Sequence, residues 1–198
     1  MPHLDLNNRQ LVFKIVYFGP GMSGKTTNLL FIHKKIFDKY KGDMVILDTE
    51  EERTLFFDFF PVSLGTVQGF SLKIHLYTIP GQVFYEASRR IILEGADGVV
   101  FVADSCIERF DDNVDMYRRM TTNLGSYGVD PTSFPIVLQY NKRDYDEVIP
   151  LGQLEAILEL PDDLPVTESI ATSGKGVMRT LQLISKEVIR NFQLDGSA

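Results

Sequence analysis

Gly19-Pro-Gly-Met-Ser-Gly24-Lys25-Thr26-Thr27 fits the phosphate-binding loop pattern G-x-x-x-x-G-K-[ST], and this motif is the strongest indication of the fold. The apolar run at residues 11–18 before it predicts a strand, and the periodic pattern of residues 27–40 after it predicts a helix. Strand, glycine loop and helix are the order in which such a loop occurs. The sequence therefore predicts an anion site at the N-terminus of a helix.

The loop supplies the residue types that a nucleotide phosphate needs. Its glycines let the backbone curl so that N–H groups point inward. Lys25 is expected to reach the outer phosphates, and the Thr26 hydroxyl is expected to ligate Mg²⁺. The alternative is an ordinary glycine turn with a solvated lysine. The loop residues expected to bind the nucleotide are Gly19, Gly21, Ser23, Gly24, Lys25, Thr26 and Thr27.

A second motif, Asn141-Lys142-Arg143-Asp144, follows an apolar run at residues 136–140 that predicts a buried strand. The Asp144 carboxylate is suited to accept two hydrogen bonds from the N1–H and amine of guanine, a donor pair that adenine lacks. Asn141 is expected to tie this segment to the phosphate loop, and the Lys142 stem to lie against the base. The alternative is a polar strand-to-helix turn. Together the two motifs favour GTP over ATP.

With these motifs the chain resembles the Ras-like small GTPases and, within them, the MglA family of bacterial polarity and motility GTPases. The closer similarity lies in residues 14–21, 52–59, 75–85 and 97–104, and extends from about residue 7 to residue 192. The resemblance implies a single Ras-like GTPase domain over residues 1–198. Its expected fold is the α/β, three-layer P-loop NTPase fold with a mostly parallel central sheet and one antiparallel edge hairpin.

The order of elements along the chain agrees with that fold class. Residues 62–66 and 70–78 predict the edge hairpin, with a tight turn at 67–69, and residues 99–103 predict a buried strand. Two later helices are expected to bury apolar stripes against the sheet. These stripes are Tyr117, Met120, Leu124 and Tyr127 in the first helix, and Val177, Leu181, Ile184 and Val188 in the second.

Composition narrows the classes of partner and compartment. The chain has 198 residues, a net charge of −7 and 20 Lys plus Arg against 27 Asp plus Glu, so we expect no nucleic-acid partner and no anionic-membrane binding. The only cysteine, Cys106, excludes an internal disulfide and suits a reducing compartment. Neither a signal sequence, a lipidation motif nor a membrane-spanning run is found, so we expect a cytoplasmic protein without its own membrane anchor.

The segment after the hairpin departs from the Ras-like pattern. Most Ras-like proteins have D-x-x-G there, whereas this chain has Thr78-Ile-Pro-Gly81, so a Mg²⁺-side carboxylate is replaced by a hydroxyl. Metal binding is then expected to depend on Thr26, Thr54 and the nucleotide phosphates. By resemblance, Gly81 would donate its N–H to the γ-phosphate and Gln82 would orient the attacking water. The alternative for Gln82 is a plain polar residue at a helix start.

The resemblance also assigns roles to three further residues. Arg53 falls where MglA-type proteins carry an arginine that acts on the transferring phosphoryl group in cis. Its alternative is a solvated ion pair with a neighbouring glutamate. Thr54 would ligate Mg²⁺ only while the γ-phosphate is present. Ala171 lies where Ras-like proteins offer a backbone N–H to guanine.

Two function classes follow from this sequence. In the first, the protein hydrolyses GTP slowly and switches partners with its nucleotide state. In the second, it is a nucleotide-stabilised binding scaffold with little hydrolysis, of which Thr78 would be the sign. An ATP-using P-loop enzyme is disfavoured by Asp144.

The resemblance implies a biological setting for the first class. It implies a role in cell polarity and motility, a homodimeric roadblock-fold protein as GTPase-activating partner, and effectors that bind the GTP state. The protein itself is expected to be monomeric and to be recruited to cell poles through its partners.

Overall fold

The computed structural model describes residues 3–5, 8–36, 38–46, 58–67, 69–78 and 86–195. Its centre is one eight-stranded sheet in the order β3-β4-β5-β2-β6-β7-β8, with β1 beside β2. The strands are β1 (His3–Asp5), β2 (Gln10–Phe18), β3 (Val45–Ile46), β4 (Asp58–Val67), β5 (Phe70–Thr78), β6 (Gly98–Asp104), β7 (Ile136–Asn141) and β8 (Val166–Glu168). The helices are α1 (Lys25–Lys35), α2 (Glu86–Leu93), α3 (Phe110–Ser126), α4 (Gln153–Ile157) and α5 (Val177–Asp195), with 3₁₀ turns η1 (Asp38–Tyr40) and η3 (Ile107–Arg109).

The sheet is mostly parallel, as the sequence predicts. Strands β5, β2, β6, β7 and β8 pair in parallel with their neighbours, while β4 pairs antiparallel with β5 as the expected hairpin. Two short antiparallel strands were not predicted: β3 pairs with the outer side of β4, and β1 pairs with the start of β2. With two and three residues, these strands are too short to show an alternating pattern.

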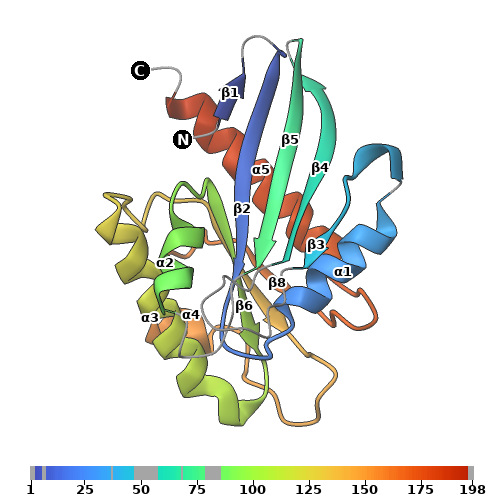
Figure 1. Ribbon diagram of the computed structural model, residues 1–198. Coiled ribbons are helices and arrows are strands. Elements are labelled where there is room, and N and C mark those ends of the chain that lie inside the picture. The colour runs from blue at the N-terminus through green and yellow to red at the C-terminus, as the bar shows by residue number, and fades with distance from the viewer. Residues whose placement is uncertain are drawn as a thin grey trace.

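Helices cover both faces of the sheet and make three layers (Figure 1). On one face, α1 and α5 pack against inward-facing residues of β2 such as Phe13 and Ile15. On the other face, α2, α3 and α4 pack against the alternate residues Val16 and Phe18. Strands β2, β6 and β7 therefore contribute to both cores, because successive side chains point to opposite faces.

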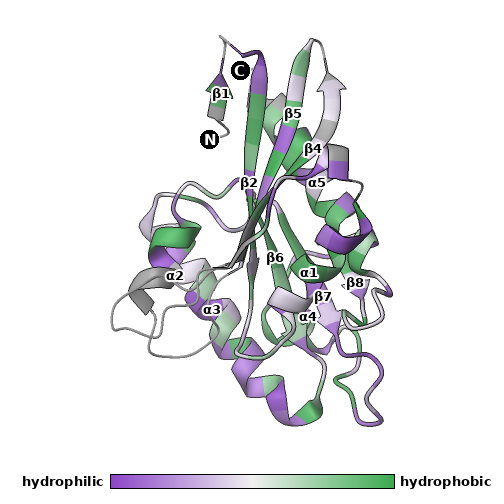
Figure 2. Cartoon of the chain, turned by 45° about the vertical axis from the view of Figure 1, so that its right-hand side comes forward, coloured by the Kyte–Doolittle hydropathy of each residue, from purple (hydrophilic) through white to green (hydrophobic). Residues whose placement is uncertain are grey.

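The predicted helix stripes are buried with one exception. All four stripe residues of α5 are buried, and so are Tyr117, Met120 and Leu124 of α3. Tyr127 is only half-buried, because α3 ends at Ser126 and Tyr127 is its C-cap. Figure 2 shows the two-sided character of α3 as hydrophilic and hydrophobic bands along one helix.

The first helix differs from the prediction at both ends. The sequence pattern favours a helix over residues 27–40, whereas α1 covers Lys25–Lys35 and Ile36 is extended, with φ −77 and ψ 136. The chain leaves the helix because residues 41–42 pair with β4, where the Gly42 N–H donates to the Pro61 carbonyl at 3.0 Å. This long-range pairing overrides the helical periodicity, and Tyr40 is 42% exposed as a result.

Candidate nucleotide-binding site

The phosphate loop connects β2 to α1, at the carboxyl end of the parallel strands. Gly19 and Gly24 have φ values of +148 and +99. A Cβ atom on Gly19 would lie 2.3 Å from the Val102 carbonyl oxygen, and one on Gly24 would lie 2.2 Å from Asn141 Nδ2. Both positions therefore require glycine for space as well as for backbone conformation.

Lys25 lies across this loop and is almost fully buried, with 6% of its surface exposed. Its ammonium group donates to the carbonyl oxygens of Gly19 at 3.0 Å and Pro20 at 2.7 Å. These two bonds hold the cation against the loop itself. A fixed cation beside a row of backbone N–H groups is the arrangement that binds phosphate.

The remaining side chains of the loop fit an anionic ligand as well. Residues 19–27 contain no carboxylate, and they contain three hydroxyl groups, on Ser23, Thr26 and Thr27. Thr26 is exposed, so its hydroxyl is accessible to a ligand, and Thr27 is half-buried. The buried Ser23 Oγ has no hydrogen-bond partner among the described residues. The donor set therefore fits a nucleotide phosphate with Mg²⁺ at Thr26.

Asn141, at the end of β7, joins three segments of the site. Its Nδ2 donates to the Ser23 carbonyl at 2.7 Å, and its Oδ1 accepts from Ser169 Oγ and from the Ala171 N–H, both at 2.9 Å. The side chain is buried, at 2% exposed. The prediction that Asn141 ties the base motif to the phosphate loop is confirmed. The Ala171 N–H donates to Asn141 here, so its role toward guanine stays a prediction.

The rest of the base motif is held by ion pairs. Lys142 Nζ lies 2.7 Å from the Asp104 carboxylate, which ends the neighbouring strand β6. Arg143 pairs with Glu168 of β8 at 2.9 Å and donates to the Ile149 carbonyl at 2.7 Å. Asp144 is exposed to solvent. The motif thus presents its last carboxylate outward while its two cations fix the loop.

A buried polar network supports the loop from behind. Asn28 of α1 donates from Nδ2 to the Gly24 carbonyl at 2.9 Å. Gln139 of β7 donates to Asn28 Oδ1 at 3.0 Å and to Thr180 Oγ1 of α5 at 2.9 Å. These bonds fix the start of α1 relative to the sheet. A rigid helix start keeps its N–H groups aimed at one point.

Two residues of the site are missed by the sequence motifs, Asp104 and Arg109. Asp104 ends a buried apolar strand, as Asn141 does, and that position is the only sequence signal for it. Burial and the Asp104 carboxylate also raise the pKa of the nearby Cys106 thiol, so this thiol stays protonated at neutral pH. Arg109 donates from Nη2 to the Gly21 carbonyl at 3.0 Å, and no motif indicates it.

Four predicted site residues lie outside the described residues: Arg53, Thr54, Gly81 and Gln82. Their roles stay predictions. Thr78, which replaces the usual aspartate, is described and buried at the end of β5, where its backbone pairs with Tyr17 of β2. The end of β5 thus lies beside the strand that leads into the phosphate loop.

The chain is similar to known small GTPases over nearly its whole length. Mutual gliding-motility protein MglA of Myxococcus xanthus (strain DK1622) is 44% identical over 196 residues, which cover 99% of this chain and 100% of that protein. Ras-related protein Rab7A of Mesembryanthemum crystallinum is 25% identical over 194 residues, covering 93% of this chain and 86% of Rab7A. Human ADP-ribosylation factor-like protein 4C is 21% identical over 182 residues, covering 89% of this chain and 86% of that protein.

No protein-family model matches the chain. None of the described helices is long and apolar enough to cross a membrane. The similarity to MglA, at 44% identity, nevertheless extends over both chains from end to end. The sheet order, the phosphate loop and the base motif of this chain agree with that similarity. The chain therefore belongs to the MglA family of small Ras-like GTPases.

Proposed function

We propose that the protein binds GTP and GDP with Mg²⁺, hydrolyses GTP slowly, and acts as a nucleotide-dependent switch in cell polarity and motility. The observation that carries this proposal is the contact of Asn141 with the Ser23 carbonyl at 2.7 Å. That contact brings the base motif against the phosphate loop, so one ligand with a guanine at one end and phosphates at the other would span both. The printed name of the relative MglA, a mutual gliding-motility protein, supports the biological setting.

Each part of the site has one role in this proposal. Lys25 and the N–H groups of the loop bind the phosphates, and Asp144 selects guanine over adenine. Ala171 and Lys142 complete the base pocket. Mg²⁺, when bound, neutralises phosphate charge, and Thr26 and Thr54 are the hydroxyls that would hold it.

Hydrolysis depends on two residues next to the phosphates. Gln82 orients the attacking water, and the Arg53 guanidinium stabilises the charge that develops on the transferring group. Gly81 donates its N–H to the same group. A roadblock-fold homodimer accelerates the reaction by placing Arg53 and does not supply an arginine of its own. The protein works as one domain over residues 1–198, monomeric alone, in the cytoplasm and at cell poles through its partners.

Single-turnover phosphate release tests the catalytic part, with and without a purified roadblock-fold homodimer from the same organism. We expect Gln82→Leu and Arg53→Ala to bind GTP nearly as the parent does, while partner-stimulated turnover falls by about 10²-fold or more. The defect of Arg53→Ala should persist at saturating partner, because the partner brings no replacement cation. Arg118→Ala, at an exposed position of α3, serves as the matched control.

Two results would overturn parts of this proposal. If Arg53→Ala is stimulated like the parent, Arg53 is a solvated ion-pair residue and not a catalytic one. If the parent binds GTP and shows no turnover with or without the partner, the binding-scaffold alternative replaces the enzyme.

A further inference from the structure

Arg109 reaches the phosphate loop from outside the known motifs. It lies at the end of η3, directly before α3, and its Nη2 donates to the Gly21 carbonyl at 3.0 Å across 88 residues of sequence. Its Nη1 lies 2.5 Å from the Asp112 carboxylate, and its Nε lies 3.9 Å from the Asp104 carboxylate. The guanidinium is therefore held on two sides by acidic groups, which leaves the Nη2 donor aimed at the loop.

The bond to Gly21 sets the direction of a backbone donor. In a trans peptide the C=O of one residue and the N–H of the next point in opposite directions, and the described part of the chain contains no cis peptide bond. Because the Gly21 carbonyl turns outward to Arg109, the Met22 N–H turns inward to the concave side of the loop. Asn141 orients the Ser23–Gly24 peptide in the same way. Its side chain donates to the Ser23 carbonyl, so the Gly24 N–H turns inward.

The residue after the Arg109 contact is strained. Met22 has φ +64, in the left-handed region that favours glycine, and its side chain is 89% exposed. A non-glycine residue keeps this conformation only where its surroundings hold it. The hydrogen bond from Arg109 goes to the Gly21 carbonyl, which belongs to the peptide directly before Met22. It therefore stabilises the strained conformation of Met22.

We propose that Arg109 is a positioning residue for the nucleotide phosphates: it fixes the Gly21–Met22 peptide so that the Met22 N–H faces the anion. Asp112 and Asp104 orient the guanidinium, and Asp104 also pairs with Lys142 of the base motif at 2.7 Å. The Asp104 carboxylate thus contacts both Arg109, which binds the phosphate loop, and Lys142 of the base motif. This inference rests on the proposed nucleotide binding and adds a residue to it.

The test measures GDP and GMP affinity and the GDP dissociation rate for variants in the full chain. We expect Arg109→Ala to release GDP about tenfold faster, since it removes one charge-assisted hydrogen bond at a partly exposed position. GMP affinity should stay within about twofold, because the loop acts on the outer phosphate. Arg109→Lys should be intermediate, about threefold, because an ammonium donates to Gly21 without the fixed fork of a guanidinium.

A second variant isolates the backbone mechanism. Met22→Gly adopts a positive φ without strain, so the competent loop becomes more populated without Arg109. In the Met22→Gly background, Arg109→Ala should therefore accelerate GDP release by only about threefold. Arg118→Ala removes one positive charge from α3, the helix that follows Arg109, without touching the loop, and should change the rate by less than twofold.

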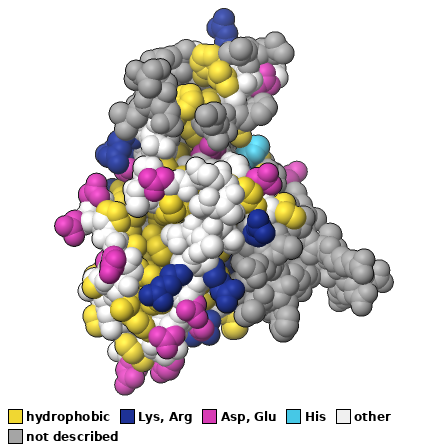
Figure 3. Space-filling view, turned by 90° about the vertical axis from the view of Figure 1, so that its left-hand side faces the viewer, with side chains coloured by type: hydrophobic (Ala, Val, Ile, Leu, Met, Phe, Trp, Pro, Cys, Tyr) yellow, Lys and Arg dark blue, Asp and Glu magenta, His cyan; other side chains and the backbone are white. Residues whose placement is uncertain are grey.

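Figure 3 views the side of the molecule that carries α2, α3 and α4, where basic and acidic side chains lie interspersed.

Each outcome decides the inference. If Arg109→Ala releases GDP at the rate of Arg118→Ala, or if GMP weakens as much as GDP, the positioning role is wrong. If Met22→Gly leaves the full tenfold effect, the backbone mechanism is wrong. If Arg109→Ala does not fold, Arg109→Lys with and without Met22→Gly makes the same comparison. If the parent itself binds no GDP, the proposed function fails, and this failure is distinct from that of the Arg109 inference.

Discussion

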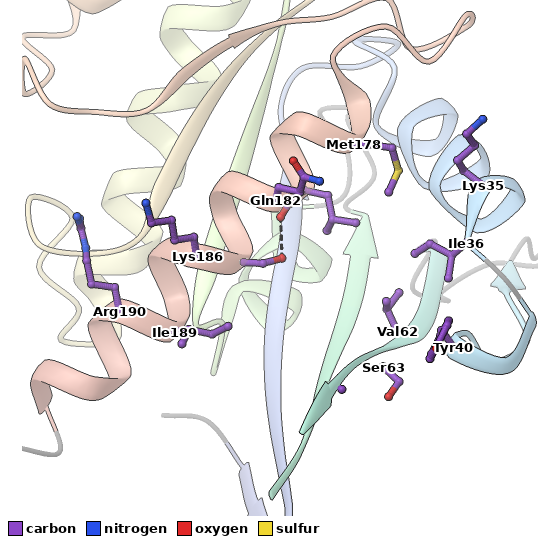
Figure 4. A pocket seen from close by; sticks show the side chains of 13 residues that line it. Lys35, Ile36, Tyr40, Val62, Ser63, Met178, Gln182, Lys186, Ile189 and Arg190 are labelled. Carbon is purple, nitrogen blue, oxygen red and sulfur yellow. Dashed lines mark hydrogen bonds between the residues drawn. The ribbon is translucent and has the colours of Figure 1, made fainter. Parts of the chain in front are cut away.

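The surroundings of the two ends of helix α1 are very different. At the N-terminal end, at Lys25, lies the phosphate loop. At the C-terminal end, about 16 Å away for an 11-residue helix, lies a cavity of about 940 Å³ between α1, β4 and α5 (Figure 4). Its lining is mainly apolar and includes the cations Lys35, Lys186 and Arg190. The other lining residues are Ile36, Tyr40, Val62, Ser63, Gly65, Met178, Leu181, Gln182, Ser185 and Ile189.

The orientation of backbone and side-chain donors, and not the volume of a cavity, makes an anion site. The N-terminal end of α1 presents backbone N–H groups and the positive end of the helix dipole, and the buried Lys25 adds a fixed charge. The C-terminal end presents carbonyls, and the cations there lie on side chains that are exposed, such as Lys35 and Lys186. The last turn of α1 carries His33, Lys34 and Lys35, which offset its own dipole.

The largest expected effect is at Lys25. Lys25→Ala removes the only cation of the loop and its two bonds to the Gly19 and Pro20 carbonyls. We expect GTP and GDP to bind about 10³-fold more weakly, because the buried phosphates lose their charged partner. Titration of a fluorescent GDP analogue measures this. Retained submicromolar affinity would mean that the loop does not hold the phosphates.

The second largest expected effect is on the choice between guanine and xanthine nucleotides. Asp144→Asn replaces a pair of acceptors by an acceptor and a donor, which suits the 2-carbonyl of xanthine in place of the amine of guanine. We expect the ratio of GTP to XTP affinity to fall by about 10²-fold, with phosphate binding unchanged. A competition experiment between the two nucleotides reports this ratio. An unchanged ratio would place the base away from the Asn141 to Asp144 motif.

The smallest expected effect on nucleotide affinity comes from the α5 side of the cavity that lies at the C-terminal end of α1. Leu181→Ala truncates a side chain that is 5% exposed, so the free energy of unfolding should fall by about 2–4 kcal/mol in urea at saturating GDP. The affinity for GDP should stay within about threefold, because this residue fixes no part of the phosphate loop. The exposed Lys186→Gln is the control and should change neither quantity. A tenfold loss of affinity in Leu181→Ala would show that the two ends of α1 are coupled.

The features of this protein that short sequence patterns encode could be predicted without a structure. The glycines and Lys25 of the phosphate loop lie in one stretch, and the apolar runs around them follow strand and helix periods closely enough to predict the sheet and most of the core. The Asn141 to Asp144 motif is also local, and together with the phosphate loop its residue types favour guanine. The end of α1 at Lys35 could not be predicted this way, because a distant strand decides it.

How these segments come together in space depends on contacts that no short pattern contains. The bonds that shape the site connect residues far apart in sequence: Asn141 with Ser23 across 118 residues, Arg109 with Gly21 across 88, and Lys142 with Asp104 across 38. A local pattern records which conformation a segment prefers, and not which distant donor will turn toward its carbonyls. Those partners become neighbours only because parallel strands bring their carboxyl ends to one edge of the sheet.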